Sequence, residues 1–419
     1  MKKIPLIFGL FFILFGWGQT KIKVVFYNVL DYPEAPPANR ATILKSILDD
    51  IQPDIFMVAE LQSEAGADEI LNTSLQRADN RYARAAFVVN QSGSSPGTLQ
   101  QLIFYNTQKL LFTGQSEIIT TRRDINHYTF TLKTENMATN PLLLDVFVAH
   151  LKSLQGGTNE AIRLDMVLDF TTVLGSIPNS HFVLFGGDFN IYKDTEAAYQ
   201  ELLDTSNAIV MVDPINRPGN WHVNSSFEDI HTQSTRSYSF TDGLGNFFGA
   251  GGNLDDRFDF ILMSENLQSS SDLYYISGSY KAYGNNGNCF DKSITDISCA
   301  GFYSQTIREN LFNMSDHLPV VMELETPENT LAIENITTIN PVFFIKGNLV
   351  SNWLELQLNS NLQGKILKIY NQLGQGVLVR LITDSNNIKY NVNHLKPGVY
   401  YIKIDNITSG KPLKFIKLP

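Results

Sequence analysis

The sequence of 419 residues has little cysteine and no long apolar run. Two cysteines, Cys289 and Cys299, cannot supply the dense disulfide framework of a small secreted domain, and two thiolates alone leave a zinc site without its other ligands. The apolar run from Ile4 to Trp17 contains Pro5 and is shorter than the roughly 20 residues that cross a bilayer. We therefore expect no stable membrane span.

The sequence also lacks several familiar catalytic motifs. It has no P-loop, no dinucleotide-binding glycine pattern, no zincin motif and no cysteine-based zinc site. Ser153 and Ser315 stand near histidines, but neither lies in the pattern of a nucleophile elbow. These absences disfavour nucleotide-binding, zinc-peptidase and serine hydrolase chemistry.

The first residues have the layout of a signal peptide. Met1 is followed by two lysines, the apolar run and the small or polar residues Gly18, Gln19 and Thr20. We expect residues 1–19 to be removed on export; the alternative is a retained anchor. In an oxidising compartment, the spacing of the two cysteines then predicts a Cys289–Cys299 disulfide, with two free thiols as the alternative.

Positive charge is scarce over most of the chain. Residues 20–334 carry 20 Lys and Arg against 39 Asp and Glu, a net charge of −19, whereas residues 335–419 carry 10 against 3, a net charge of +7. An acidic large domain argues against the sequence-independent electrostatic grip of structural DNA-binding proteins. It permits an enzyme whose metal ions offset the repulsion.

Alternating apolar patterns predict an α/β (α+β) fold for residues 20–326. Many strands with few helices between them favour two packed sheets flanked by helices over a doubly wound parallel sheet. Helices are expected over Arg40–Asp50 and Asn159–Leu174. The predicted strands are Ile22–Tyr27, Asp54–Ala59, Ala86–Val89, Leu102–Tyr105, Tyr128–Leu132, Leu142–His150, His181–Phe185, Phe258–Met263 and Val320–Leu324.

A linker is expected over residues 327–340, where turn residues gather and the net charge changes sign. Residues 341–419 then predict a small all-β sandwich. Its expected strands are Leu354–Leu358, Lys365–Tyr370, Gly376–Leu381, Val399–Ile404 and Leu413–Lys417.

Acid, amide and imidazole side chains lie within or just beyond predicted strands of the large domain. Taken singly, each has an ordinary explanation as a cap, an Asx-turn or a helix start. Taken together they form one candidate site, because open sheets present ligands at strand ends. The set comprises Asn28, Glu60, His150, Asp188, Asn190, Asp259, Asp316 and His317.

These residue types suit hydrolysis of a phosphate ester. Glu60 supplies a charged oxygen and Asn28 a neutral one for a hard cation. Asp188 is the candidate base for the attacking water. His317 can meet the negative charge of the transition state, with Asp259 holding its ring and its proton.

The order and wording of the motifs resemble the endonuclease/exonuclease/phosphatase superfamily over roughly residues 21–325. The resemblance rests above all on Gly-Asp188-Phe-Asn190 and Ser-Asp316-His317-Leu-Pro. It implies a four-layered α/β sandwich and Mg²⁺, Mn²⁺ or Ca²⁺ as the cofactor. It places Asp316 near the metal with Asn28 and Glu60, and gives Asn190 the water and phosphate with Asp188. His150 would contact phosphate or assist the leaving group.

Two features depart from or extend this pattern. Apurinic endonucleases have an acidic residue two positions after the first Asn, where this chain has Leu30, which disfavours abasic-site repair. Lys152 and Arg163 are further candidates for binding substrate phosphate; the alternative is a solvated lysine and a solvated helix-face arginine.

The C-terminal region resembles the type A sorting domain of the type IX secretion system. The resemblance rests on Ile369–Gln375, on Leu395–Lys403 and on the closing Lys414–Lys417. It implies the type IX secretion machinery as a partner and a secreted or cell-surface location after passage through the periplasm. An ordinary β-sandwich binding module is the alternative.

The resulting prediction is a monomeric, secreted, metal-dependent phosphodiesterase, an extracellular nuclease with nucleic acid as its substrate. A sphingomyelinase-type phospholipase or a phosphomonoesterase would use the same site. A surface binding protein built on a catalytically dead enzyme fold is the alternative of another class.

Overall fold

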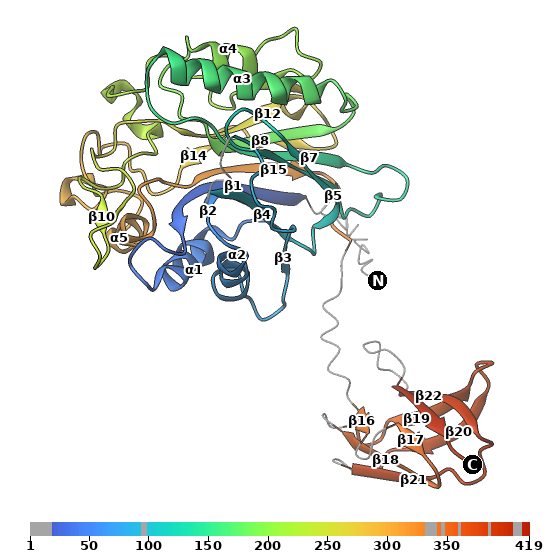
Figure 1. Cartoon of the computed structure of the whole chain (residues 1–419). Helices are drawn as coiled ribbons and strands as arrows, with labels where there is room; N and C mark the ends of the chain where they lie inside the picture. Colours follow the sequence, from blue (N-terminus) through green and yellow to red (C-terminus); the bar gives the residue numbers. More distant parts are fainter. Residues whose placement is uncertain are drawn as a thin grey trace, which may run out of the picture. The chain divides into compact units, whose positions relative to one another are not determined.

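The computed structural model describes residues 19–93, 99–331, 342–344, 348–358, 362–383, 387–404 and 413–419. The chain divides into two units, Met1–Ala332 and Ile333–Pro419 (Figure 1). The expected signal peptide and most of the expected linker lie outside the described residues. Among the helices of the described segments, none has the length and apolar character needed to cross a membrane.

The first sheet of the large unit is centred on β1. Strand β1 runs parallel to β2 and antiparallel to β15, and β4 extends the sheet beyond β2. The strands of this sheet are β1 (Thr20–Tyr32), β2 (Ile55–Leu61), β3 (Tyr82–Arg84), β4 (Gln100–Asn106), β13 (Tyr274–Tyr275), β14 (Lys281–Ala282) and β15 (Val320–Thr326).

The second sheet has the strand order β5-β6-β7-β8-β12-β9. Strand β7 pairs in parallel with β8, with His150 opposite Asp188, and β12 pairs antiparallel with β8, with Asp259 opposite Asp188. This register places His150, Asp188 and Asp259 side by side at the same end of the sheet. The strands are β5 (Leu110–Ile118), β6 (Ile125–Leu132), β7 (Leu143–His150), β8 (Phe182–Asp188), β9 (Met211–Val212) and β12 (Asp259–Ser264).

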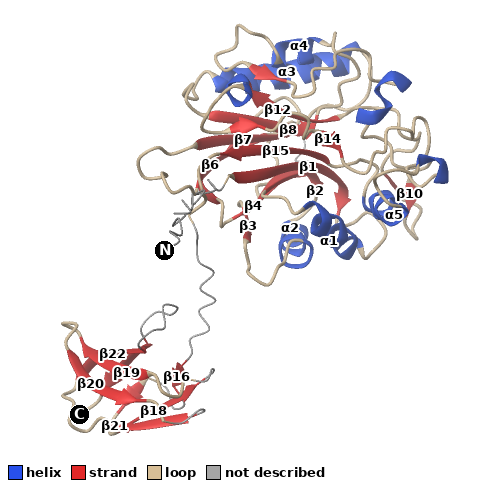
Figure 2. Cartoon of the chain, turned by 180° about the vertical axis from the view of Figure 1, so that it is seen from behind, coloured by secondary structure: helices blue, strands red, loops and turns tan. Residues whose placement is uncertain are grey.

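The two sheets pack face to face with helices on both outer sides, which makes four layers (Figures 1 and 2). Helices α3 (Gly157–Leu174) and α4 (Ala197–Leu202) cover the second sheet; α1 (Arg40–Ile51), α2 (Glu64–Glu69) and α5 (Gln305–Met314) cover the first. The sheets approach closely at Gly186, where a Cβ would lie 2.6 Å from Met57 Cε. The predicted four-layered sandwich is confirmed.

The strand predicted over Ala86–Val89 is wrong. The regular strand ends earlier, at Arg84, and the amide and carbonyl of Ala86 bond to the side chain of Gln115 and not to a neighbouring strand. The apolar residues there are only partly buried or exposed, and Phe87 packs against the main core without belonging to a strand.

The predicted Cys289–Cys299 disulfide is confirmed. Both half-cystines are buried, at 1% and 0% exposure, and belong to the main core of the large unit. The bridge therefore ties an irregular segment rich in Gly, Asn and Ser to that core.

The second unit is built from short strands around its own core, which includes Leu354, Ile369 and Phe415. All five predicted strands are present to within two residues; β16, β17 and β21 add to them. The strands are β16 (Val342–Phe344), β17 (Leu349–Val350), β18 (Trp353–Leu358), β19 (Ile366–Asn371), β20 (Gly376–Leu381), β21 (Asn387–Asn391), β22 (Gly398–Ile404) and β23 (Leu413–Lys417).

Candidate active site

Strand ends from both sheets meet at one cleft of the large unit. The cleft has a volume of about 260 Å³. The second sheet contributes His150, Asp188 and Asp259 through the register described above, and the first sheet contributes Asn28 and Glu60. The segment between α5 and β15 adds Asp316 and His317. The cleft is lined by Glu60, His150, Asp188, Asn190, Asp316 and His317, with Asn28 and Asp259 bonded behind them.

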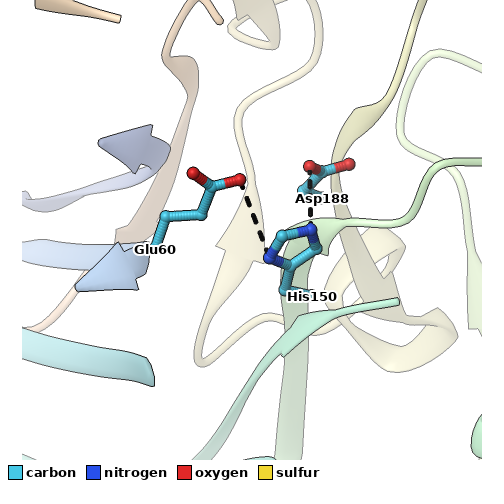
Figure 3. Close-up of side chains that lie close together, drawn as sticks. All are labelled: Glu60, His150 and Asp188. Atoms are coloured by element: carbon cyan, nitrogen blue, oxygen red, sulfur yellow. Dashed lines mark ion pairs between the residues drawn. The ribbon is translucent and has the colours of Figure 1, made fainter. Parts of the chain in front are cut away.

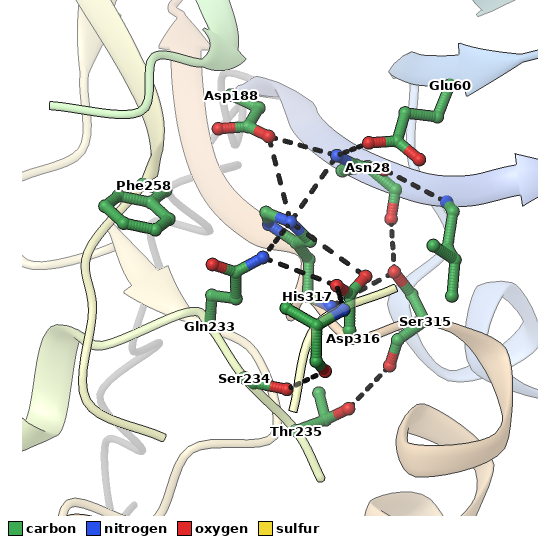
Figure 4. Close-up of polar contacts among 12 residues, drawn as sticks. Asn28, Glu60, Asp188, Gln233, Ser234, Thr235, Phe258, Ser315, Asp316 and His317 are labelled. Carbon is green, nitrogen blue, oxygen red and sulfur yellow. Dashed lines mark hydrogen bonds and ion pairs between the residues drawn. The ribbon is translucent and has the colours of Figure 1, made fainter. Parts of the chain in front are cut away.

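Asn28 is the centre of the hydrogen-bond network (Figure 4). Its amide nitrogen donates to Glu60 Oε1 at 2.9 Å and to Asp188 Oδ2 at 3.1 Å, while its oxygen accepts from the backbone of Leu30 at 3.0 Å. The amide nitrogen, and not the expected metal-binding oxygen, thus faces the cluster. In this orientation Asn28 holds carboxylates from the two sheets together.

His317 is paired with Asp259 as expected from the motifs. Its Nδ1 lies 2.7 Å from Asp259 Oδ2, and its Nε2 points to the cleft, 3.7 Å from Asp188 Oδ2. Burial alone would lower the pKa of His317, but the carboxylates of Asp259, Asp316 and Asp188 raise it well above its usual value. These carboxylates therefore favour the charged form of the ring.

Asp188 is oriented by its own loop. Asn190 donates to Asp188 Oδ1 from its side chain at 2.8 Å and from its backbone at 3.2 Å, which leaves Oδ2 facing the other sheet. Burial raises the pKa of Asp188; His317 opposes this shift, and Asp259 and Glu60 add to it. A carboxylate with a raised pKa can accept a proton near neutral pH.

His150 lies between Glu60 and Asp188, as Figure 3 shows. Its Nε2 is 3.5 Å from Asp188 Oδ2, and its Nδ1 is 4.0 Å from Glu60 Oε1. Burial lowers the pKa of His150 well below its usual value, and the positive charges of Arg123, His317 and Lys152 act in the same direction. A neutral imidazole can donate one hydrogen bond to a phosphate or leaving oxygen, but it carries no spare proton for general-acid catalysis.

The backbone bends sharply at this cleft. Leu30, Asp31, Glu60 and Asn190 all have left-handed φ angles, between +43° and +63°. Such angles cost non-glycine residues on the order of 1–3 kcal/mol each and persist only where surrounding contacts impose them. One such contact is Arg40, whose buried guanidinium donates to the carbonyls of Val29 and Met314 and so ties the end of β1 to the segment before Asp316.

The cluster has the donors that a divalent cation requires. Asp316 Oδ1 is buried and has no hydrogen-bond partner among the described residues, whereas Oδ2 accepts from the backbone of Ala250 at 2.7 Å. Burial, followed by the charge of Asp316, raises the pKa of Glu60 to about 7. Two carboxylates that repel each other, one with an oxygen that accepts no hydrogen bond, fit a bound cation.

Four residues at the cleft were not predicted from the sequence. Gln233 Nε2 lies 2.8 Å from His317 Nε2, and the amides of Gln233 and Ala250 both donate to Asp316. Arg123 lines the cleft and donates to the carbonyl of His150. Asp31 supplies a cleft-lining carboxylate one position after Leu30. Of these residues, only Asp31 could have been found from the sequence, because it is an acid one position after Leu30, where apurinic endonucleases have an acidic residue.

The two residues proposed from sequence as phosphate ligands have different surroundings. Lys152 is partly exposed beside the cleft, and its ammonium bonds to the carbonyl of Ser153 at 2.7 Å. Arg163 is fully buried and pairs with Glu196 at 2.7 Å, while its Nη1 donates to the carbonyls of Lys152 and Leu154. Arg163 therefore fixes the loop after β7 and is not available to a substrate, because its charge is already paired within the core.

The fold is the four-layered sandwich expected from the motifs, and its cleft combines the groups that hydrolysis of a phosphoric ester requires. Buried carboxylates, an Asp-held imidazolium and an oriented base meet at one cleft of the four-layered sandwich.

Comparison with known proteins matches residues 348–417 to the family model of the secretion system C-terminal sorting domain. The protein therefore carries a sorting domain for type IX export to the cell surface or beyond. No curated protein matches the chain.

Several solved structures are similar to the large unit at low sequence identity. TDP2 from D. rerio, complexed with a single-stranded DNA product, is 16% identical, covers 73% of this chain and 99% of its own, and has a TM-score of 0.46. An endonuclease/exonuclease/phosphatase family protein from Bacteroides thetaiotaomicron is 14% identical, with 74% and 99% coverage and a TM-score of 0.44. A mannosyl-6-phosphatase from the same organism is 14% identical, with 72% and 99% coverage and a TM-score of 0.41.

The raised pKa values of Glu60 and Asp188 predict a pH-dependent effect of metal on stability. Between about pH 4 and pH 7 the folded, metal-free protein retains protons that the unfolded chain has released, so its stability falls as the pH rises through this window. A cation that binds the ionised carboxylates offsets this loss. We expect millimolar Mg²⁺ to raise Tm more at about pH 8 than at about pH 5, relative to EDTA. An equal Mg²⁺ effect at both pH values in thermal unfolding would contradict this.

Proposed function

We propose that the protein is a secreted, Mg²⁺-dependent nuclease that hydrolyses phosphodiester bonds of nucleic acid outside the cell. The observation that carries the proposal is the convergence of Glu60, Asp188, Asp316 and His317 on one cleft, with a buried oxygen of Asp316 that accepts no hydrogen bond from the described residues. We further propose residues 20–326 as the catalytic domain, 327–340 as the linker and 341–419 as the secretion domain.

In this proposal Asp188 removes the proton from the attacking water. Its Oδ1 is held by Asn190 and its Oδ2 accepts from Asn28, and Oδ2 also faces His317 and His150 at the cleft, where the attacking water would bind. The raised pKa of Asp188 makes the transfer of that proton near neutral pH less unfavourable than it would be for a solvent-exposed aspartate.

His317 meets the negative charge that develops on the phosphoryl oxygens. Asp259 keeps its ring protonated and oriented, and neutral His150 donates a hydrogen bond from the neighbouring strand end. A divalent cation bound by Glu60 and Asp316 would neutralise phosphoryl oxygens and stabilise the leaving oxygen. Asn28 keeps the carboxylates of the two sheets in place around it.

Nucleic acid is favoured as substrate by a basic cluster at the rim. Arg123 lines the cleft, and Arg122 and Lys152 are near enough that both arginines lower the pKa of Lys152, after the effect of burial. This local positive charge stands out in a region with a net charge of −19. Lysine and arginine side chains beside a phosphoryl site suit a polymer with further phosphates on either side.

A panel of substrates tests the proposed function. The purified protein should hydrolyse plasmid DNA, RNA or single-stranded oligonucleotides with Mg²⁺, and EDTA should abolish this activity because Glu60 and Asp316 require a cation. Sphingomyelin and a generic phosphomonoester serve as comparison substrates. Hydrolysis of either comparison substrate without any cleavage of nucleic acid would contradict the nuclease assignment, and no hydrolysis of any substrate would favour a binding protein on a dead enzyme fold.

Substitutions of the His–Asp pair test the mechanism. His317→Ala should lower kcat about 10²–10³-fold, because it removes the group that meets the transition-state charge, and Asp259→Asn should lower kcat less. His127→Ala is a matched control, since His127 Nε2 pairs with Asp145 at 2.6 Å in the same sheet but does not line the cleft. Steady-state kinetics at saturating metal measure the effect. A wild-type kcat for His317→Ala would overturn the mechanism.

A further inference from the structure

A second groove, of about 360 Å³, lies on the hairpin of β10 (Phe240–Thr241) and β11 (Phe247–Phe248). Pro36 and Pro37 line it from the loop after β1, and Tyr238 and Phe240 line it from the hairpin. None of the side chains that line this groove is charged, although the surrounding region has a net charge of −19. The groove therefore suits a flat, uncharged group and not a phosphate or a cation.

The groove and the catalytic cleft share no lining residue, but the β10–β11 hairpin leads from one to the other. Phe240 pairs with Phe248 across the hairpin, and the two residues that follow Phe248 line the cleft, where the amide of Ala250 bonds to Asp316. Phe248, opposite Phe240, is only two residues before Ala250, so the hairpin and the Asp316 contact belong to one short segment. A nucleic acid chain with its scissile phosphate at Asp316 would reach the groove along this segment.

The ring of Phe240, which lines the groove, packs against the buried side chain of Arg236. The buried guanidinium of Arg236 lies 3.9 Å from the ring centroid of Phe240 and 5.8 Å from that of Phe312. Its three nitrogens have no hydrogen-bond partner among the described residues, so the rings are its main neighbours. The ring of Tyr238 packs 6.3 Å from Phe240 and 6.5 Å from Phe312. The cluster is thus already assembled without a ligand.

Tyr238 is nevertheless 59% exposed. The turn of the neighbouring β10–β11 hairpin is closed by hydrogen bonds. The carboxylate of Asp242 accepts hydrogen bonds from the backbone of Leu244 at 2.8 Å and of Asn246 at 2.9 Å, and from the Asn246 side chain at 2.7 Å. A fixed aromatic side chain can bind a planar partner with little loss of conformational entropy.

On these observations, and resting on the proposed nuclease function, we propose that the groove binds one unstacked nucleobase of a single-stranded substrate, with Tyr238 stacking on the base. In this arrangement Arg122, Arg123 and Lys152 at the rim of the cleft bind phosphates, and the uncharged aromatic groove binds a base. Bases in a duplex are stacked and paired, whereas those of a single strand are free to stack on protein side chains. The site should therefore favour single-stranded nucleic acid.

The test uses the full chain and a single-stranded oligonucleotide with one hydrolysable linkage. Stacking on an aromatic side chain predicts that Tyr238→Ala raises KM about tenfold or more with kcat changed less than about twofold. An abasic residue placed at successive positions beside the linkage should raise KM of the unmodified enzyme similarly at one position, and should add nothing in Tyr238→Ala. Tyr238→Phe keeps the ring and should behave like the native protein.

Phe302→Ala is the control for loss of a surface aromatic, since Phe302 is 89% exposed and lines neither the cleft nor the groove. An unchanged KM for Tyr238→Ala at every position would overturn the base subsite. Loss of binding to sphingomyelin vesicles by Tyr238→Ala, with an unchanged oligonucleotide KM, would assign the groove to lipid and also overturn it. Failure of the native protein to cleave any oligonucleotide is a different result, which contradicts the proposed function itself.

Discussion

Repulsion among buried carboxylates is the constraint on which the rest of the site depends. Glu60, Asp188, Asp259 and Asp316 are brought together at one cleft, and such a cluster is costly unless positive charge or hydrogen bonds balance it. Inside the protein these carboxylates are balanced by His317, whose pKa they raise, and by hydrogen bonds from the amide of Asn28. The remaining imbalance, expressed in the raised pKa of Glu60, is what a divalent cation would neutralise.

The fold supplies the precision that this cluster requires. Strand register alone aligns His150, Asp188 and Asp259 across three neighbouring strands, so no loop has to place them. The two sheets then meet through Asn28, whose amide bridges Glu60 on one sheet and Asp188 on the other. These contacts join residues of different layers that are far apart in the sequence. The same packing that holds the two sheets together therefore forms the site. The C-terminal sorting domain serves a separate purpose, the export of the protein.

The sequence predicted those parts of the structure whose residues combine chemical character with regular spacing. Polar residues at the ends of apolar strands identified the cleft, because hydrophobic periodicity locates a strand and a carboxylate is unusual at its buried end. Gln233 and Arg123 could not be found in this way, since both lie in irregular segments and have no distinctive neighbours in sequence. Arg163 was misjudged because its partner, Glu196, is 33 residues away, and the pattern of a helix does not show which face is paired.

The most direct test of this account is to locate the metal. In crystals of the protein soaked with Mn²⁺, anomalous scattering should show an ion in the cleft, where the carboxylates of Glu60 and Asp316 would hold it. An ion found only at another acidic group, or a fully formed cleft that binds no ion at saturating Mn²⁺, would contradict the claim that a cation balances this cluster.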